Sequence, residues 1–288
     1  MSETADLKPA TRVSGNSSVI GELRLHEFPS PIFRNIRMLR VWLPPEYDAA
    51  PNSDRRYPVL YLNDGQNLFD RATAFGGAEW EVDETADRLI RERAIPPLVV
   101  VGIDNAQAER MKEYLPYRSF QPPILRPRGK CYPEFLLGEV MKFVGERYRI
   151  ARGPENTGLG GSSLGALISL YTVIKHPGIF GRLLLESPSL YISQRRVLKA
   201  SRRCVRWPEK VFAGVGTREA GREDKDRQVV EDVRELESIL RRSGFDEQRL
   251  RVRVDDGAIH NEREWARRFP DALTFLFGSS MSASGPSQ

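Results

Sequence analysis

The sequence contains very little cysteine, and this scarcity excludes whole classes of protein. Its 288 residues include two cysteines, Cys131 and Cys204. Two cysteines cannot build the dense disulfide framework of a small secreted scaffold. They also lack the second cysteine pair, or the histidines at suitable spacing, that a zinc site needs. We therefore expect no structural metal.

Long hydrophobic runs are missing as well. No run approaches the roughly 18 apolar residues that are needed to cross a bilayer. The N-terminal residues 1–18 have no basic stretch followed by an apolar core, which is the pattern of a secretory signal. We therefore expect a cytoplasmic protein without a membrane partner.

The interior of the chain has no internal repeat and no Gly/Ser-rich linker. We expect a single domain over residues 18–278, preceded by a mobile tail (1–17) and followed by a disordered tail (279–288), because both end segments are small and polar. The composition is 40% hydrophobic and 29% charged, which excludes global disorder.

The chain is basic, with 44 Lys and Arg against 39 Asp and Glu, a net charge of +5. Acidic residues are interspersed almost everywhere and no aromatic-interleaved binding module is present, so we expect no nucleic-acid partner. The Arg-rich segment 194–206 is compatible with a surface helix or with a cap over a site. The basic residues gather mainly at Arg126, Arg128, Lys130, Arg195, Arg196, Arg202 and Arg203.

Apolar patterning predicts an α/β fold. Residues 21–28 and 37–43 alternate apolar and polar residues, as in an antiparallel hairpin. Further strands are predicted at 58–63, 98–104, 157–161, 182–186, 210–216 and 250–257, and helices at 80–93, 132–148, 164–175, 226–242 and 261–277. Strands that alternate with helices imply a mostly parallel sheet of about eight strands with helices on both faces. The last strand is expected near a sheet edge.

The most informative motif is G-x-S-x-G at residues 161–165, between a predicted strand and a predicted helix. A sharp strand-to-helix turn exposes the central serine, Ser163, and its small neighbours let the chain fold closely. The N–H of Leu164 then faces outward at the start of the helix, where it can stabilise an oxyanion. The sequence therefore predicts a nucleophilic serine.

A serine nucleophile needs a base, and the chain has three histidines. His26 lies in the first hairpin, and His176 follows the helix that Ser163 begins, where a structural role is expected. His260 follows the last strand, so its loop lies at the same carboxyl-end edge of the sheet as Ser163. We therefore predict His260 as the general base.

The third member of such a site is a carboxylate that orients the histidine. In hydrolases whose serine lies in a G-x-S-x-G turn, this carboxylate falls between the serine and the histidine in the chain. Glu219, directly after the strand at 210–216, is our choice. Glu223, Asp224 and Glu186 remain alternatives. Each of these residues is also compatible with a solvated loop charge.

The loop 63–70 follows an early buried strand, where a second oxyanion donor is expected. The backbone N–H of Gln66 is the first choice and that of Asn67 the second; an ordinary capped loop is compatible with both. The long stretch 105–131 is typical of a lid or binding loop. Its Arg118, Arg126 and Arg128 are candidates to hold an anionic part of a substrate.

Several motifs together resemble the esterase family that includes the enterochelin esterase-like and esterase D-like α/β hydrolases. Relatives of that family are feruloyl and acetyl-xylan esterases and mycolyltransferases. The resemblance covers residues 20–278. It is carried by YLNDGQNLFD, Trp80, VVVGID with Arg110 and Glu113-Tyr114, GGSSLGA, FGRLLLESPS, and His260-Asn261-Glu262 with Trp265.

The resemblance implies an α/β-hydrolase fold and an enzyme that cleaves carboxylic esters through an acyl-enzyme, without metal or organic cofactor. It carries over to Ser163, His260 and the amides of Gln66 and Leu164. The family often has Asp where Glu219 stands, and His-Gly where this chain has Asp64-Gly65.

The expected partner is a small or medium ester: short-chain acyl, feruloyl-like or siderophore-lactone-like. An acyltransferase of the same fold and an inactive binding module on a hydrolase scaffold are the alternatives. The candidate substrate-binding residues are Asn67, Trp80, Arg110, Tyr114, Ser162 and Tyr191.

Overall fold

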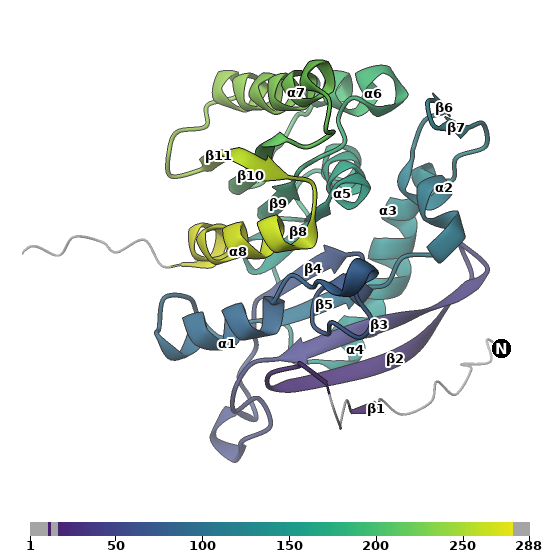
Figure 1. Cartoon of the computed structure of the whole chain (residues 1–288). Coiled ribbons are helices and arrows are strands. Elements are labelled where there is room, and N and C mark those ends of the chain that lie inside the picture. Colours follow the sequence, from purple (N-terminus) through teal and green to yellow (C-terminus); the bar gives the residue numbers. More distant parts are fainter. Residues whose placement is uncertain (1–10, 13–16, 279–288) are drawn as a thin grey trace, which may run out of the picture.

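The computed structural model describes residues 11–12 and 17–278. One central sheet runs through this part of the chain, with helices on both of its faces (Figure 1). Thr11 and Arg12 pair with the first long strand, and the Ser17 hydroxyl donates a hydrogen bond to Asp70. The other residues of the two predicted tails lie outside the described residues.

The sheet has the strand order β1-β2-β3-β5-β4-β8-β9-β10-β11. Strands β1 to β3 are antiparallel and β3 joins β5 antiparallel, whereas β5, β4, β8, β9, β10 and β11 are all parallel. Apart from the two-residue β1, this is the predicted eight-stranded, mostly parallel sheet with an N-terminal hairpin. As predicted, the last strand lies at an edge. The bounds are β1 Thr11–Arg12, β2 Glu22–Ser30, β3 Asn35–Leu43, β4 Val59–Asn63, β5 Val99–Ile103, β8 Thr157–Ser162, β9 Arg182–Glu186, β10 Lys210–Arg218 and β11 Leu250–Ile259.

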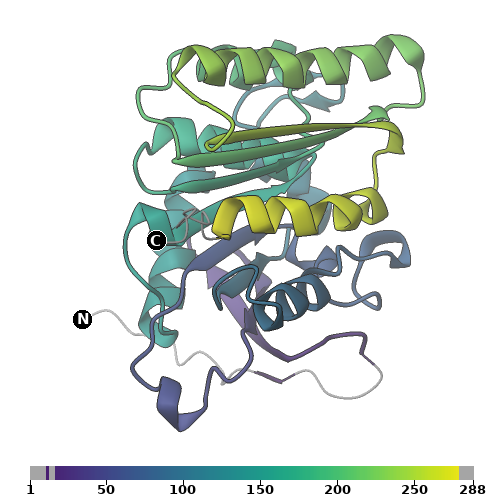
Figure 2. The same cartoon turned by 90° about the vertical axis from the view of Figure 1, so that its left-hand side faces the viewer.

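The helices divide between the two faces of the sheet. Helices α1 and α8 lie side by side on one face (Figure 2), and the others cover the opposite face or its rim. The bounds are α1 Val82–Arg91, α2 Arg110–Tyr114, α3 Tyr132–Glu134, α4 Met141–Arg147, α5 Leu164–Lys175, α6 Ile192–Ser201, α7 Glu223–Arg242 and α8 Glu262–Phe277.

Two hydrophobic cores hold these layers together, because successive strand residues point to opposite faces. In β4, Val59 and Tyr61 enter the core under α3 to α7, whereas Leu60 and Leu62 enter the core under α1 and α8. All four side chains are buried. This two-sided burial explains why the parallel strands read as continuous apolar runs.

Two segments show detail that their sequence pattern did not indicate. The predicted helix at 132–148 is continuous, but its middle turn, Phe135–Val140, is a π-helix between α3 and α4. The stretch 105–131 contains α2 and a small hairpin of β6 (Ser119–Phe120) and β7 (Pro123–Ile124). No helix in the described part of the chain is long and apolar enough to span a membrane.

Candidate active site

Ser163 is the one residue between the end of β8 and the start of α5. Its backbone conformation (φ 55°, ψ −121°) is one that non-glycine residues rarely adopt. Its N–H donates to the Glu186 carbonyl over 2.8 Å, which anchors the turn to β9. A side chain at Gly165 would come within 3.0 Å of Asn63, so the glycine lets α5 approach β4. The motif thus has the strained geometry that its spacing predicted.

The Ser163 side chain lies 3.2 Å from the hydroxyl of Ser189, oxygen to oxygen. Leu164 is the first residue of α5, and its N–H has no intrahelical acceptor at that position. Among the described residues, the N–H groups of Leu164 and Gln66 donate to no protein acceptor. Both groups are therefore free to receive a negatively charged oxygen.

His260 lies at the end of β11, and its Nδ1 is 2.5 Å from Oε2 of Glu219. Glu219 is buried (side chain 1% exposed), whereas His260 is one-third exposed. The indole of Trp265 packs edge-on against the imidazole, with ring centroids 5.1 Å apart. The histidine is therefore held by a carboxylate at one ring nitrogen and by an aromatic ring at its side.

The Glu219 carboxylate is fixed by further hydrogen bonds at its other oxygen. Oε1 accepts from the Gly216 N–H over 2.5 Å and from the Ser187 hydroxyl over 2.7 Å. Ser187 in turn accepts from the Trp265 indole over 2.9 Å. Burial acts to raise the pKa of Glu219, but the hydrogen bonds from His260, Gly216 and Ser187 lower it below its ordinary value. The group is therefore ionised at neutral pH.

The three alternative carboxylates have other partners. Glu223 pairs with Arg227 and Asp224 with Arg222, both on the exposed start of α7. Glu186 is fully buried and accepts from Arg268 over 2.8 Å. Of the four candidates, Glu219 is the one in contact with His260.

A cavity of about 670 Å³ opens at the serine and the histidine. The segments that follow β4, β5, β8 and β11 line it, together with Arg40 of β3. Its lining residues are Arg40, Asp64, Gln66, Asn67, Thr73, Phe75, Asp104, Asn105, Gln107, Arg110, Ser162, Ser163, His260, Glu262 and Trp265. The two predicted reactive residues therefore share one cavity.

Among the predicted substrate-binding residues, Asn67, Arg110 and Ser162 line the cavity, as does Gln66. The structure does not bring the other three to it. Trp80 is buried against Trp265 and Phe269, and Tyr114 is fully buried, with its hydroxyl accepting from the Asp64 N–H over 3.3 Å. Tyr191 is 47% exposed and is not part of the cavity wall. The aromatic character of these three residues therefore did not indicate whether each one lies in the core, on the surface or in the cavity wall.

Two ion pairs form a wall of the cavity, and of their four residues the sequence analysis had singled out only Arg110 as a candidate for substrate binding. Arg110 binds both oxygens of Asp64 (2.7 and 2.8 Å), and Arg40 binds both oxygens of Asp104 (2.7 and 3.0 Å). Asn105 also donates to Asp64 over 2.6 Å. For the other residues, the only signal in the sequence was that Asp64 and Asn105 directly follow predicted strands and that Asp104 ends one.

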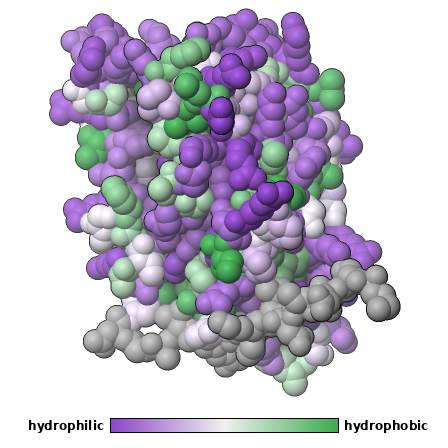
Figure 3. Space-filling view, turned by 90° about the vertical axis from the view of Figure 1, so that its right-hand side faces the viewer, coloured by the Kyte–Doolittle hydropathy of each residue, from purple (hydrophilic) through white to green (hydrophobic). Residues whose placement is uncertain are grey.

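Arg118, Arg126 and Arg128, the candidates to hold an anionic part of a substrate, do not line this cavity. Arg118 and Arg126 line a separate hollow of about 480 Å³ with Arg196 of α6. Arg128 donates to the carbonyls of Phe33 and Ile32. Figure 3 views the molecule from the side of the β6–β7 hairpin, and this face is largely hydrophilic. Residues 194–201 of the Arg-rich segment lie in α6 and residues 202–206 follow it, and none of them lines the cavity that contains Ser163.

The fold and the serine turn are those of an α/β hydrolase. The family described as "Putative esterase" matches residues 30–276, so the chain belongs to that family. It is therefore a carboxylic ester hydrolase, as the resemblance of its motifs implied.

Among proteins similar in sequence, YbbA of Bacillus subtilis (strain 168) is 25% identical over 255 residues, which is 85% of this chain and 94% of that protein. YjcH of the same organism is 25% identical over 225 residues, covering 76% of this chain and 84% of that protein.

Similar solved structures include the BES protein from Bacillus cereus (TM-score 0.71, 18% identity, 93% of this chain and 100% of that one). The IroE-like serine hydrolase from Shewanella oneidensis has a TM-score of 0.69 at 17% identity, covering 89% and 80%. The enterobactin esterase FES from Shigella flexneri has a TM-score of 0.66 at 18% identity, covering 93% of this chain and 59% of that chain. At this identity the likeness establishes the shared fold.

Proposed function

We propose that the protein is a serine carboxylic ester hydrolase that works through an acyl-enzyme on a small or medium ester. The observation that carries this proposal is the 2.5 Å contact between His260 and the buried carboxylate of Glu219, in the cavity that also contains Ser163. A carboxylate at Nδ1 keeps the proton on that nitrogen, which leaves Nε2 free to accept a proton.

In the proposed reaction, the Ser163 hydroxyl oxygen attacks the ester carbonyl carbon while His260 Nε2 takes the hydroxyl proton. The imidazolium that forms is stabilised by ionised Glu219. The tetrahedral intermediate collapses, the C–O bond to the alcohol breaks, and His260 gives its proton to the leaving alkoxide. A water molecule then attacks the acyl-serine, with His260 again as base, and the acid is released.

The negative oxygen of the tetrahedral intermediate needs hydrogen-bond donors in place before the reaction. The N–H groups of Leu164 and Gln66 are the proposed donors. Leu164 also belongs to the first turn of α5, whose dipole favours negative charge at that end. The side chain of Asn67 is already engaged by Glu262 and by the Phe75 N–H, which supports a structural role in holding this loop.

The charges of the cavity favour an uncharged substrate. Arg40 and Arg110 are each neutralised by a bidentate aspartate, and Glu262 adds a further carboxyl group. Burial and the nearby Asp64 raise the pKa of Glu262 above its ordinary value, so an additional negative charge is unfavourable there. We therefore expect neutral esters with hydrogen-bonding groups, including neutral feruloyl-type esters, in preference to anionic ones.

The test is hydrolysis of a panel of p-nitrophenyl esters, acetate to decanoate, and of methyl ferulate, by the wild type and by Ser163→Ala. We expect turnover of short or aromatic acyl esters and a loss of about 10⁴ to 10⁶-fold in the variant. An anionic ester such as a mono-ester of succinate should react more slowly than the matched neutral butyrate.

Two outcomes would redirect the proposal. Transfer of the acyl group to an added acceptor alcohol in preference to water would identify an acyltransferase. No turnover of any ester, together with no labelling of Ser163 by a serine-reactive phosphonate, would indicate a binding module on a hydrolase scaffold.

A further inference from the structure

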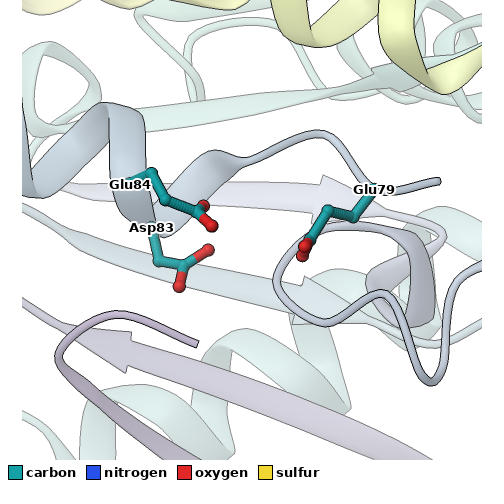
Figure 4. Close-up of side chains that lie close together, drawn as sticks. All are labelled: Glu79, Asp83 and Glu84. Carbon is teal, nitrogen blue, oxygen red and sulfur yellow. The ribbon is translucent and has the colours of Figure 1, made fainter. Parts of the chain in front are cut away.

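Three carboxyl groups meet on the side of α1 that faces the N-terminal segment. Asp83 and Glu84 come from the first turn of α1, and Glu79 comes from the loop before it (Figure 4). One oxygen of each lies within 4.8 Å of one oxygen of each of the others. The Glu79 and Asp83 residues are 3% and 0% exposed, so bulk water does not separate these charges.

Each of the three groups also has a buried oxygen without a partner. Glu79 Oε2, Asp83 Oδ1 and Glu84 Oε2 have no hydrogen-bond donor among the described residues. The remaining oxygens of the two buried residues are engaged: Ser18 donates to Glu79 Oε1, and the Ile20 N–H donates to Asp83 Oδ2. Buried carboxylate oxygens in folded proteins are almost always paired, so three orphan oxygens in one place need an explanation.

Protein cations near the cluster are too few to explain it. Arg71 reaches Glu79 over 3.3 Å, but its own side chain is 64% exposed. Neither Asp83 nor Glu84 forms an ion pair with a described Lys, Arg or His. The start of α1 favours negative charge, but a helix terminus carries the equivalent of only about half a unit charge. Among the described residues, no second positive charge therefore faces the cluster.

We propose that Glu79, Asp83 and Glu84 bind a divalent cation, and that Ca²⁺ is the ion that fits best. Ca²⁺ accepts oxygen ligands at about 2.3 to 2.6 Å in a flexible geometry, whereas Mg²⁺ demands a near-ideal octahedron at about 2.0 to 2.1 Å. The three carboxylate oxygens lie within 4.8 Å of one another without forming part of a regular octahedral cage, so the more tolerant ion is the better fit. Glu84 is only half-buried, which leaves an open side where water completes the coordination.

The scarcity of cysteine and histidine does not bear on such a site, because Ca²⁺ prefers oxygen ligands. The ion would join three parts of the chain: residues 17–20, the loop before α1, and α1 itself. That loop is tied back to the turn after β4, since the Trp80 N–H donates to the Asn67 carbonyl over 2.9 Å. The inference stands independently of the proposed reaction.

The experiment uses the full chain, stripped with a chelator, and measures its unfolding temperature against added Ca²⁺. At about a hundred times the Kd we expect Tm to rise by roughly 5 °C, with a smaller rise for Mg²⁺ at the same concentration. Tb³⁺ is the second probe, because light absorbed by tryptophan excites a nearby bound Tb³⁺. Trp80 adjoins Glu79 in the chain, and the Trp42 indole donates to the Ile20 carbonyl.

Asp83→Asn should abolish both the Tm rise and the sensitised Tb³⁺ emission. It should still fold, because it removes one of the mutually repelling charges. Glu84→Gln, at a half-buried position, serves as a second variant. Asp87→Asn, on the same helix but paired with Arg91, is the matched control and should respond as the wild type does.

The rival explanation is that the cluster holds protons instead of a metal ion. Burial and the neighbouring Glu84 raise the pKa of Asp83 to about 9, so a proton is the natural occupant where no cation binds. No Tm change with Ca²⁺ up to about 10 mM, well above the weakest usual Kd of calcium modules, would establish this rival and overturn the proposal. Equal responses of Asp83→Asn and Asp87→Asn would overturn it as well.

Discussion

The substitution Glu219→Gln tests the proposed site most sharply, because the surroundings of Glu219 dictate how a glutamine must sit. Oε1 of Glu219 accepts hydrogen bonds from the Gly216 N–H and the Ser187 hydroxyl. An amide NH₂ cannot accept these bonds, so the amide oxygen of the glutamine must take this position. The NH₂ group then faces His260 Nδ1.

This orientation forces the histidine into the wrong tautomer. Nδ1 must accept from the NH₂ group, so the proton moves to Nε2, the nitrogen that should receive the proton of Ser163. Loss of the correct tautomer in serine hydrolases costs about 10⁴-fold in kcat, which corresponds to about 5.4 kcal/mol of transition-state stabilisation. The substitution preserves volume and two of the three hydrogen bonds, so we expect little change in Tm.

The assay is kcat and KM with the best p-nitrophenyl ester, alongside Tm. Glu219→Asp keeps the charge and should retain more activity than Glu219→Gln. Glu223→Gln changes an exposed carboxylate that pairs with Arg227 on α7, and it should be indistinguishable from the wild type. A Glu219→Gln enzyme within tenfold of wild-type kcat, with Ser163→Ala inactive, would refute the role assigned to Glu219.

Three further predictions concern residues around the site and the core. Arg268→Met should lower the free energy of unfolding by roughly 3 to 5 kcal/mol in urea denaturation, because it leaves Glu186 buried and uncompensated; a loss below about 1 kcal/mol would contradict this. Burial and two nearby arginines lower the pKa of His26 from 6.5 to about 4. Between these two pH values the unfolded chain therefore binds a proton at His26 that the folded chain does not bind. Wild-type stability should therefore fall by up to about 3 kcal/mol more than that of His26→Gln as the pH drops from 6.5 to 4, and parallel curves would refute it. Ser189→Ala should reduce kcat by less than about tenfold, because its hydroxyl contacts the proposed nucleophile without a role in proton transfer; a loss as large as that of Ser163→Ala would assign Ser189 to the chemistry.

The sequence indicated those parts of the site whose positions follow from the order of strands and helices along the chain. Ser163 follows a parallel strand and precedes a helix, and His260 follows the last strand, so both fall at the same edge of the sheet. Their positions depend only on which segments are strands, and strand segments are recognisable from their apolar runs. Glu219 was harder to choose, because many acidic residues fall between Ser163 and His260 in the chain. Of the four candidates, only Glu219 contacts His260, and the Gly216 and Ser187 donors hold it there.

The cavity wall could not be predicted in this way, because its residues become neighbours only when segments far apart in the chain pack against one another. Arg40 belongs to β3 and Asp104 follows β5, yet the antiparallel pairing of these strands brings them into one ion pair. Trp80 was a candidate substrate-binding residue, but its hydrophobic indole lies in the core beneath α8. Composition alone therefore cannot separate a lining residue from a core residue. The distinction depends on whether a neighbouring element covers the side chain, which is a property of packing between segments far apart in the chain.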